Sequence, residues 1–233
     1  MQTIYKLSFA APTINALHAF HYPSVDRKTM TFALKERPIV LLGAGVLGRR
    51  IAATFLAGGY TVHIRDPSSA ALADAESFIA AQLLSFVAVL PKTGAIHASG
   101  SLRTFTEIAP AVQGAWLVVE AVPEKLELKK TTFAAVAASA PADCVLASNS
   151  SSFKSRLMVE GLDKWRERTL NMHFTMPPAI RTVELMTDGE TRHELFRVLS
   201  EVLRECGMVP VTAKRESTGY VLSLSFVRHE DIC

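Results

Sequence analysis

The chain has 233 residues, of which 49% are hydrophobic and 20% are charged. This composition supports one well-packed domain, or one domain and a small second one, and it excludes a disordered or low-complexity protein. The formal net charge is only +3 and Lys and Arg occur in no block longer than a pair, so nucleic acid is not an expected partner, and no apolar run approaches the ~20 residues of a membrane helix.

Residues 1–29 contain few charges and scattered hydroxyl residues, which is faintly similar to an organelle transit peptide but poorer in arginine. A disordered extension ahead of a start at Met30 explains this segment equally well. The three cysteines, Cys144, Cys206 and Cys233, fit neither a disulfide framework nor a zinc site, so we expect no metal. They favour a reducing compartment, which we expect to be the cytoplasm, with the mitochondrion as the alternative.

The next part of the chain predicts two strands, each followed by a helix. Ile39–Leu42 is a short apolar run that ends at glycine, as a buried parallel strand does. From Leu47 to Phe55, apolar residues recur every four positions, which predicts a helix that ends at a glycine pair. Residues 60–65 form the second predicted strand, and residues 68–90 form a long alanine-rich helix.

The same alternation continues through the middle of the chain. Residues 116–119 predict a buried strand, and Pro123 predicts the start of a helix with Glu124 and Glu127 in its first turn. A further strand over residues 144–147 leads into a serine-rich segment. Strands and helices that alternate at this spacing predict an α/β fold, a Rossmann-type doubly wound parallel sheet.

A glycine-rich motif of the form GxGxxG lies between the first strand and the first helix. Its first glycine permits a tight turn, its second lets the backbone approach a pyrophosphate, and its third lets helix and strand pack closely. Asp66 ends the second strand, where a carboxylate accepts hydrogen bonds from a ribose and repels a 2′-phosphate. The pattern predicts NAD rather than NADP, although a glycine-rich turn without ligand is the alternative. The predicted cofactor residues are Gly43, Ala44, Gly45, Val46, Leu47, Gly48 and Asp66.

Five segments follow one another in the order of a known family, namely Gly43–Ile51, Val119–Glu124, Ser148–Ser151, Met172–Pro178 and Val183–Leu185. Together, over about residues 38–222, they resemble the NAD-binding domain of the L-3-hydroxyacyl-CoA dehydrogenases, a group that includes the lambda-crystallin-like sugar-acid dehydrogenases. The resemblance implies an oxidoreductase that transfers a hydride between the C3 hydroxyl of a 3-hydroxyacyl-CoA and NAD, in fatty acid metabolism and β-oxidation.

The resemblance also implies roles for single residues. Glu124 and Lys129 match positions that contact NAD. Ser151 matches the serine that hydrogen-bonds substrate near the nicotinamide, and it counts among both the catalytic and the cofactor-binding residues. His173 matches the catalytic base, and Glu184 matches the carboxylate that orients this base.

Elementary chemistry supports the last two roles. Oxidation of a secondary alcohol by hydride transfer needs a group that takes the hydroxyl proton, and imidazole has a pKa near working pH. A carboxylate on the other ring nitrogen fixes the tautomer. We expect His173 and Glu184 face to face on two strands joined by the turn at Met176–Pro178. The alternatives are a hydrogen-bonded core histidine, an exposed strand glutamate and, for the Ser148–Ser152 run, a turn that caps the next helix.

The sequence departs from the family pattern at three places, one of which is the spacing between His173 and Glu184, which is a residue shorter than is common in the family. Met176 stands where the family has an asparagine that helps to hold cofactor or substrate. Residues 216–220 resemble the segment that leads into the family's second domain, but Ser223 and Leu224 replace the expected Asn and Arg, and the sequence ends at Cys233. We therefore expect the C-terminal helical domain to be missing. The predicted domains are an N-terminal extension (1–37), an NAD-binding Rossmann domain (38–215) and a remnant of the linker (216–233).

The sequence thus predicts an NAD-dependent enzyme that resembles 3-hydroxyacyl-CoA dehydrogenases and acts on a small-molecule acyl-CoA or 3-hydroxy acid. It would form a homodimer only with a helical domain, which makes the dimer interface in the family. Without that domain the cleft is open to water, so we expect NADH binding with weak or absent turnover of acetoacetyl-CoA. The alternatives are a dehydrogenase of another 3-hydroxy acid, such as a sugar acid, and an NAD-binding module with little catalysis.

Overall fold

The computed structural model describes residues 34–92 and 100–213. The predicted N-terminal extension, up to residue 33, and the predicted linker remnant at residues 216–233 therefore lie outside the described residues. Arg37, at the end of the expected extension, is tied to the domain, because its guanidinium pairs with Asp143 at 2.9 Å and donates to the Ala115 carbonyl at 2.8 Å. The domain limits themselves remain predictions.

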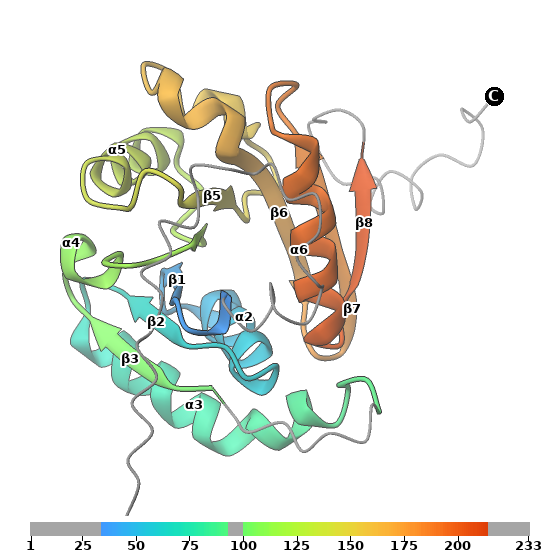
Figure 1. The fold of residues 1–233 in the computed structure, drawn as a ribbon. Coiled ribbons are helices and arrows are strands. Elements are labelled where there is room, and N and C mark those ends of the chain that lie inside the picture. Colours follow the sequence, from blue (N-terminus) through green and yellow to red (C-terminus); the bar gives the residue numbers. More distant parts are fainter. Residues whose placement is uncertain (1–33, 93–99, 214–233) are drawn as a thin grey trace, which may run out of the picture.

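The described residues form one eight-stranded sheet flanked by helices (Figure 1). The strand order is β3-β2-β1-β4-β5-β6-β7-β8; the strands from β3 to β6 are parallel, β7 runs antiparallel to β6, and β8 is parallel to β7. The strands are β1 (Ile39–Leu42), β2 (Val62–Arg65), β3 (Leu102–Phe105), β4 (Leu117–Glu120), β5 (Val145–Ser148), β6 (Thr169–Met176), β7 (Ile180–Thr187) and β8 (Val209–Ala213). The helices are α2 (Val46–Ala57), α3 (Ser69–Val87), α4 (Ile108–Ala111), α5 (Leu126–Ala137) and α6 (His193–Glu205), with short 3-10 turns η1 (Ser155–Leu157) and η2 (Asp163–Arg168).

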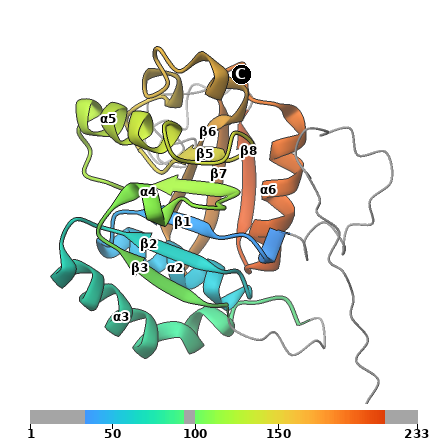
Figure 2. The ribbon, with the colours of Figure 1, turned by 60° about the vertical axis from the view of Figure 1, so that its left-hand side comes forward.

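Helices cover both faces of the sheet (Figure 2). Residues of α2, α3 and α6, such as Phe55 and Leu199, pack on one face, while Phe133 of α5 and Trp165 of η2 pack on the other. Because β1, β4 and β5 are covered on both sides, all four residues of each are buried, which explains why their residues are apolar or small except for Glu120 at the end of β4. The predicted Rossmann-type doubly wound sheet is confirmed.

The predicted start of the third helix is wrong. Helix α5 begins at Leu126, with Lys125 as its N-cap, and not at Pro123. The Lys125 N–H donates to the Pro123 carbonyl at 2.7 Å, which closes a tight three-residue turn ahead of the helix. Glu124 therefore lies in this turn rather than in the first helical turn, whereas Glu127 is in the first turn as expected.

Two edge strands escape prediction from the sequence. Strand β3 has four residues that are exposed or half-buried, so it lacks the apolar run of the central strands. Strand β8 contains Pro210, which lacks a ladder N–H and is tolerated chiefly at the edge of a sheet. Their positions follow from pairing with β2 and β7, which is a tertiary relationship.

Helix α3 meets the criteria of a membrane span by length and composition, although it contains Asp74 and Glu76. This corrects the expectation that no segment comes close to those criteria. In the fold, α3 connects β2 to β3 and buries Leu72, Ile79 and Phe86 in the core that it shares with α2. Only 22% of the qualifying window is buried, and one such helix is weak evidence for a membrane span.

The chain order reverses between β1 and β4, which are neighbours in the sheet. Connections from these two strands leave toward opposite faces, so a crevice opens beyond their carboxyl ends. The glycine-rich loop follows β1, and Ala121–Glu124 follow β4. The fold therefore brings the two predicted cofactor segments to the same edge of the sheet.

Candidate active site

The glycine-rich loop has the geometry of a phosphate cradle. Gly43 has φ +108°, and a Cβ added to Gly48 would lie 1.9 Å from the Gly43 carbonyl oxygen, so neither position accepts another residue without strain. A Cβ added to Gly45 would meet nothing within 4 Å, which leaves open space on that side. No side chain caps α2, whose first residue is Val46, so its first-turn N–H groups suit an anion.

Asp66 joins the end of β2 to this loop. Its carboxylate accepts from the Ala44 N–H at 2.9 Å and from the Ser68 N–H at 2.9 Å. The neighbouring Arg65 is turned away, because its Nε donates to the Thr106 carbonyl at 3.0 Å. A carboxylate beside the loop, without a guanidinium directed at it, fits a ribose with free hydroxyls better than a 2′-phosphate.

A buried ion network lies beyond the end of β4. Lys129 Nζ lies 2.7 Å from Glu120 Oε1 and 3.0 Å from Glu124 Oε2, and Lys129 and Glu120 are 1% and 0% exposed. The Glu120 carboxylate also accepts from the Val122 N–H at 2.8 Å and from Ser148 Oγ at 2.6 Å. The Lys129 amino group thus contacts two carboxyl groups.

The serine-rich segment after β5 closes around the same network. Ser150 Oγ donates to Glu124 Oε1, which also accepts from the Ser152 N–H at 3.1 Å. Burial opposes ionisation of Glu124, but the hydrogen bonds from Ser150 and Lys129 outweigh it and lower the pKa of this carboxyl. Ser151, between the two bonded serines, is exposed and lines the pocket described below. This segment therefore does more than cap the next helical turn.

His173 on β6 and Glu184 on β7 are direct partners in the antiparallel ladder. Residues in such a pair project from the same face of the sheet, with Cβ atoms roughly 5 Å apart. They are 7% and 2% exposed, so the alternative of an exposed strand glutamate is wrong. Burial lowers the pKa of His173 to about 3, and the Glu124 carboxylate only partly opposes this shift. The imidazole is therefore neutral at physiological pH, and burial makes it a weaker base than a free histidine.

The turn between β6 and β7 contacts helix α2, which follows the glycine-rich loop. Arg50 of α2 donates through Nη1 to the Pro177 carbonyl at 3.1 Å. Met176, the residue before this proline, is 40% exposed and has no strong hydrogen-bonding group in its side chain. The turn thus lies next to the cofactor helix while its methionine remains accessible.

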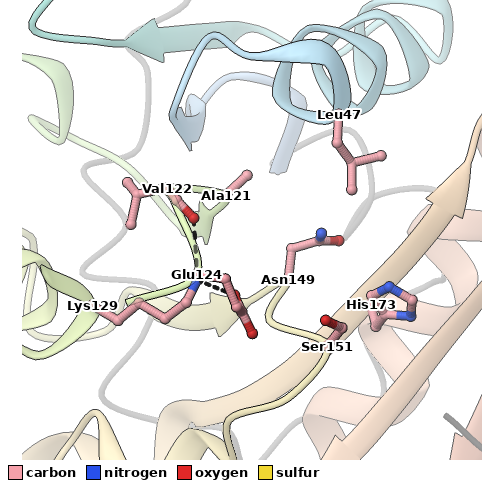
Figure 3. Close-up of a pocket in the computed structure, with 8 residues that line it drawn as sticks. All are labelled: Leu47, Ala121, Val122, Glu124, Lys129, Asn149, Ser151 and His173. Carbon is pink, nitrogen blue, oxygen red and sulfur yellow. Dashed lines mark hydrogen bonds and ion pairs between the residues drawn. The ribbon is translucent and has the colours of Figure 1, made fainter. Parts of the chain in front are cut away.

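A pocket of about 240 Å³ joins these parts (Figure 3). Of the predicted site residues, it brings together Leu47, Glu124, Lys129, Ser151 and His173. Asp66, which follows β2, and Glu184 on β7 do not line it. The same holds for the loop residues Gly43, Ala44, Gly45, Val46 and Gly48. The remaining lining residues are Ala121, Val122 and Asn149. In the described parts of the chain, no group of three or more His, Cys, Asp or Glu side chains is placed to hold a metal ion.

Sequence reasoning missed Glu120, Asn149 and Ser150. The signal for Glu120 was available, since a carboxylate that ends a four-residue buried strand needs a partner. Asn149 and Ser150 carry no comparable signal. Their contacts are with Phe174 and Glu124, which are distant in sequence.

The fold and the site define a dinucleotide-binding domain of the Rossmann type. The cradle at Gly45, the Asp66 carboxylate and the pocket beyond β4 and β5 fit NAD. Residues 38–217 match the family described as "3-hydroxyacyl-CoA dehydrogenase, NAD binding domain", and the chain belongs to this family. Its cofactor is accordingly NAD.

Similar proteins differ in their substrates. The chain is 29% identical over 189 residues to 5-formyl-3-hydroxy-2-methylpyridine 4-carboxylate 5-dehydrogenase of Mesorhizobium japonicum, covering 79% of this chain and 60% of that protein. It is 30% identical over 196 residues to 3-hydroxyadipyl-CoA dehydrogenase of Escherichia coli, covering 82% and 40%. Among solved structures, a diketoreductase has a TM-score of 0.70 and 32% identity, covering 82% of this chain and 69% of that one. The chain therefore spans less than two thirds of these two curated relatives.

Proposed function

We propose that this chain catalyses the NAD-dependent oxidation of a secondary hydroxyl group that lies β to a carbonyl, with a 3-hydroxyacyl-CoA as substrate. The observation that carries the proposal is the His173–Glu184 pair, which places a neutral buried imidazole at a pocket shared with the cofactor segments. The family supports the reaction class, and the name of the 3-hydroxyadipyl-CoA dehydrogenase relative supports the thioester.

We assign the following roles in this reaction to the cofactor and to the residues of the site. The glycine-rich loop and Asp66 would hold NAD, which would supply the acceptor for the hydride of the carbon that carries the hydroxyl. His173 takes the hydroxyl proton, and Glu184 orients the ring and stabilises the imidazolium that results. Ser151 offers a hydroxyl to the substrate oxygen from the loop after β5. The Glu124 carboxylate favours the protonated ring and so partly offsets the effect of burial on the pKa of His173.

A second substrate class is favoured by the comparisons. The names of the pyridine-carboxylate dehydrogenase and of the diketoreductase contain no coenzyme A. A free 3-hydroxy acid, such as a sugar acid, is therefore the second candidate, and a role in β-oxidation holds only if the thioester is used. A cofactor-binding module with little turnover is the third. A small-molecule substrate and a location in the cytoplasm remain part of the proposal.

A matched pair of substrates tests these candidates. The chain is supplied with NAD and either 3-hydroxybutyryl-CoA or free 3-hydroxybutyrate, which share the reacting carbon and differ in the thioester. We expect NADH formation with the thioester and a loss of roughly 10²–10⁴-fold in kcat for His173→Gln, with NADH affinity unchanged. Equal use of the free acid would favour the second candidate. NADH binding without turnover of either would favour the third.

A further inference from the structure

The side-chain amide of Asn149 has only one of its two ends occupied by the protein. Its Oδ1 accepts from the Phe174 N–H at 2.8 Å. Because a backbone N–H can only donate, the oxygen must face Phe174, and this fixes the direction of the amide nitrogen. In Figure 3 that nitrogen lies on the side of the amide away from β6. Within residues 34–92 and 100–213, no acceptor takes a hydrogen bond from it.

Asn149 is nevertheless almost fully enclosed. Its exposed fraction is 8%, and it lines the pocket together with Leu47 and His173. The Asn149 nitrogen is not among the fully buried side-chain atoms that lack a partner, so this donor is accessible from the pocket, where a bound ligand can supply the acceptor.

A neighbouring amide shows what a purely structural asparagine looks like in this fold. Asn171, on β6, accepts from the Ser155 N–H at 2.8 Å and donates through Nδ2 to the Phe153 carbonyl at 3.2 Å. It is 2% exposed, and both of its ends are satisfied by the protein. Asn149 has the same anchoring at its oxygen but not at its nitrogen. The difference between the two amides is the donor that faces the pocket.

The position of Asn149 in the sheet indicates which part of a ligand it meets. Asp66 after β2 marks the adenosine side of the crevice, so the nicotinamide half of a dinucleotide extends over the carboxyl ends of β4 and β5. Asn149 is the first residue after β5, and Ala121 is the first after β4. The hydrogen-bonding group of the nicotinamide ring is its carboxamide, whose oxygen is an acceptor.

We propose that Asn149 Nδ2 donates a hydrogen bond to the carboxamide oxygen of the nicotinamide ring of NAD. Through its oxygen the same amide holds the backbone of Phe174, the residue next to His173. One side chain would thus join the nicotinamide ring to the strand that carries the candidate base. This role goes beyond the proposed reaction and does not depend on the substrate.

Binding measurements on matched ligands and matched variants test the inference. NADH and ADP-ribose share the adenosine, the pyrophosphate and the second ribose, but only NADH carries the nicotinamide. Asn149→Asp keeps an oxygen for the Phe174 N–H and removes the donor, and Asn149→Ala provides a comparison without added charge. Asn171→Asp makes the same chemical change in the structural amide. Dissociation constants are measured by calorimetry for both ligands on each full-length variant, and stability is measured by urea unfolding.

We expect both Asn149 variants to bind NADH roughly three- to tenfold more weakly than the wild type, a range typical of one neutral hydrogen bond, while ADP-ribose binding changes less than twofold. Asn171→Asp should lower the urea midpoint and leave the ratio of the two dissociation constants unchanged. Equal weakening of NADH and ADP-ribose, or an unchanged NADH affinity in Asn149→Asp, would overturn the inference. A wild-type chain that binds ADP-ribose but not NADH would also overturn it, and one that binds neither would overturn the cofactor assignment as well.

Discussion

Lys129 of α5 and Glu120 at the end of β4 form an ion pair of 2.7 Å in which both side chains are fully buried. Removal of one partner of such a pair leaves a charge in a low-dielectric interior and typically costs about 3–5 kcal/mol. We therefore expect Glu120→Ala to lower the free energy of unfolding by roughly that amount, with part of the cost relieved because Glu124 also contacts Lys129. Urea unfolding, followed by circular dichroism, measures the change.

The adjacent lysine provides the control for this variant. Lys130 pairs with Glu160 at 2.9 Å on the surface, where solvent screens the interaction. Lys130→Ala should leave the urea midpoint almost unchanged. Equal destabilisation by the two substitutions would contradict the interpretation that burial makes the Lys129 network important.

Alanine substitutions at two glycines of the loop should distinguish an effect on stability from an effect on cofactor binding. A Cβ on Gly48 would clash with the Gly43 backbone at 1.9 Å, so Gly48→Ala should lower both stability and NADH affinity. A Cβ on Gly45 meets open space, so Gly45→Ala should keep the wild-type urea midpoint while it blocks the approach of the pyrophosphate and weakens NADH binding. Normal NADH affinity in Gly45→Ala would exclude the cradle assigned to this loop.

Asp66 should control the choice between the two dinucleotides. Its carboxylate holds the Ala44 N–H and lies where a ribose hydroxyl is expected. Asp66→Ala should weaken NADH binding by roughly ten- to a hundredfold and reduce discrimination against NADPH, because an acceptor and a repulsive charge are both lost. Fluorescence titration with both nucleotides measures this. A wild-type chain that binds NADPH as tightly as NADH would contradict the assignment.

His173 should make the stability of the fold depend on pH. Burial lowers its pKa from 6.5 to about 3, so between these values the unfolded chain binds a proton that the folded chain does not. Its contribution to stability is therefore complete above pH 6.5 and is lost progressively as the pH falls toward 3. Between about pH 7.5 and about pH 5, the wild type should lose more stability than His173→Gln in urea unfolding.

His63 has to be considered in the same experiment. Burial also lowers the pKa of His63, so this residue adds an acid-dependent loss of stability of the same sign. Because His63 is present in both proteins, the difference between their pH profiles isolates His173. Parallel profiles would mean that His173 is protonated as easily in the folded chain as in the unfolded one.

The sequence alone was sufficient for the central sheet and for the cofactor loop. Apolar runs such as Ile39–Leu42 and Cys144–Ala147 predict buried parallel strands because a strand covered on both faces has no polar side. The spacing of Gly43, Gly45 and Gly48 predicts the cradle because the positive φ of Gly43 and the close approach of Gly48 to the Gly43 backbone are local relationships. The family resemblance named His173 and Glu184, and the ladder then placed them opposite each other.

Only the tertiary structure decided what surrounds these residues. The start of α5 depends on a turn in which Glu124 reaches the serine segment after β5, 26 positions further along the chain. The partnership of Lys129 with Glu120, and of Asn149 with the Phe174 backbone, likewise joins segments that the crossovers bring to one edge of the sheet. Secondary-structure propensity cannot predict such contacts, because two segments that are distant in sequence become neighbours only through the order of the strands in the sheet. The sequence by itself therefore determined the fold class and the cofactor, whereas the folded sheet decided which polar groups form the site.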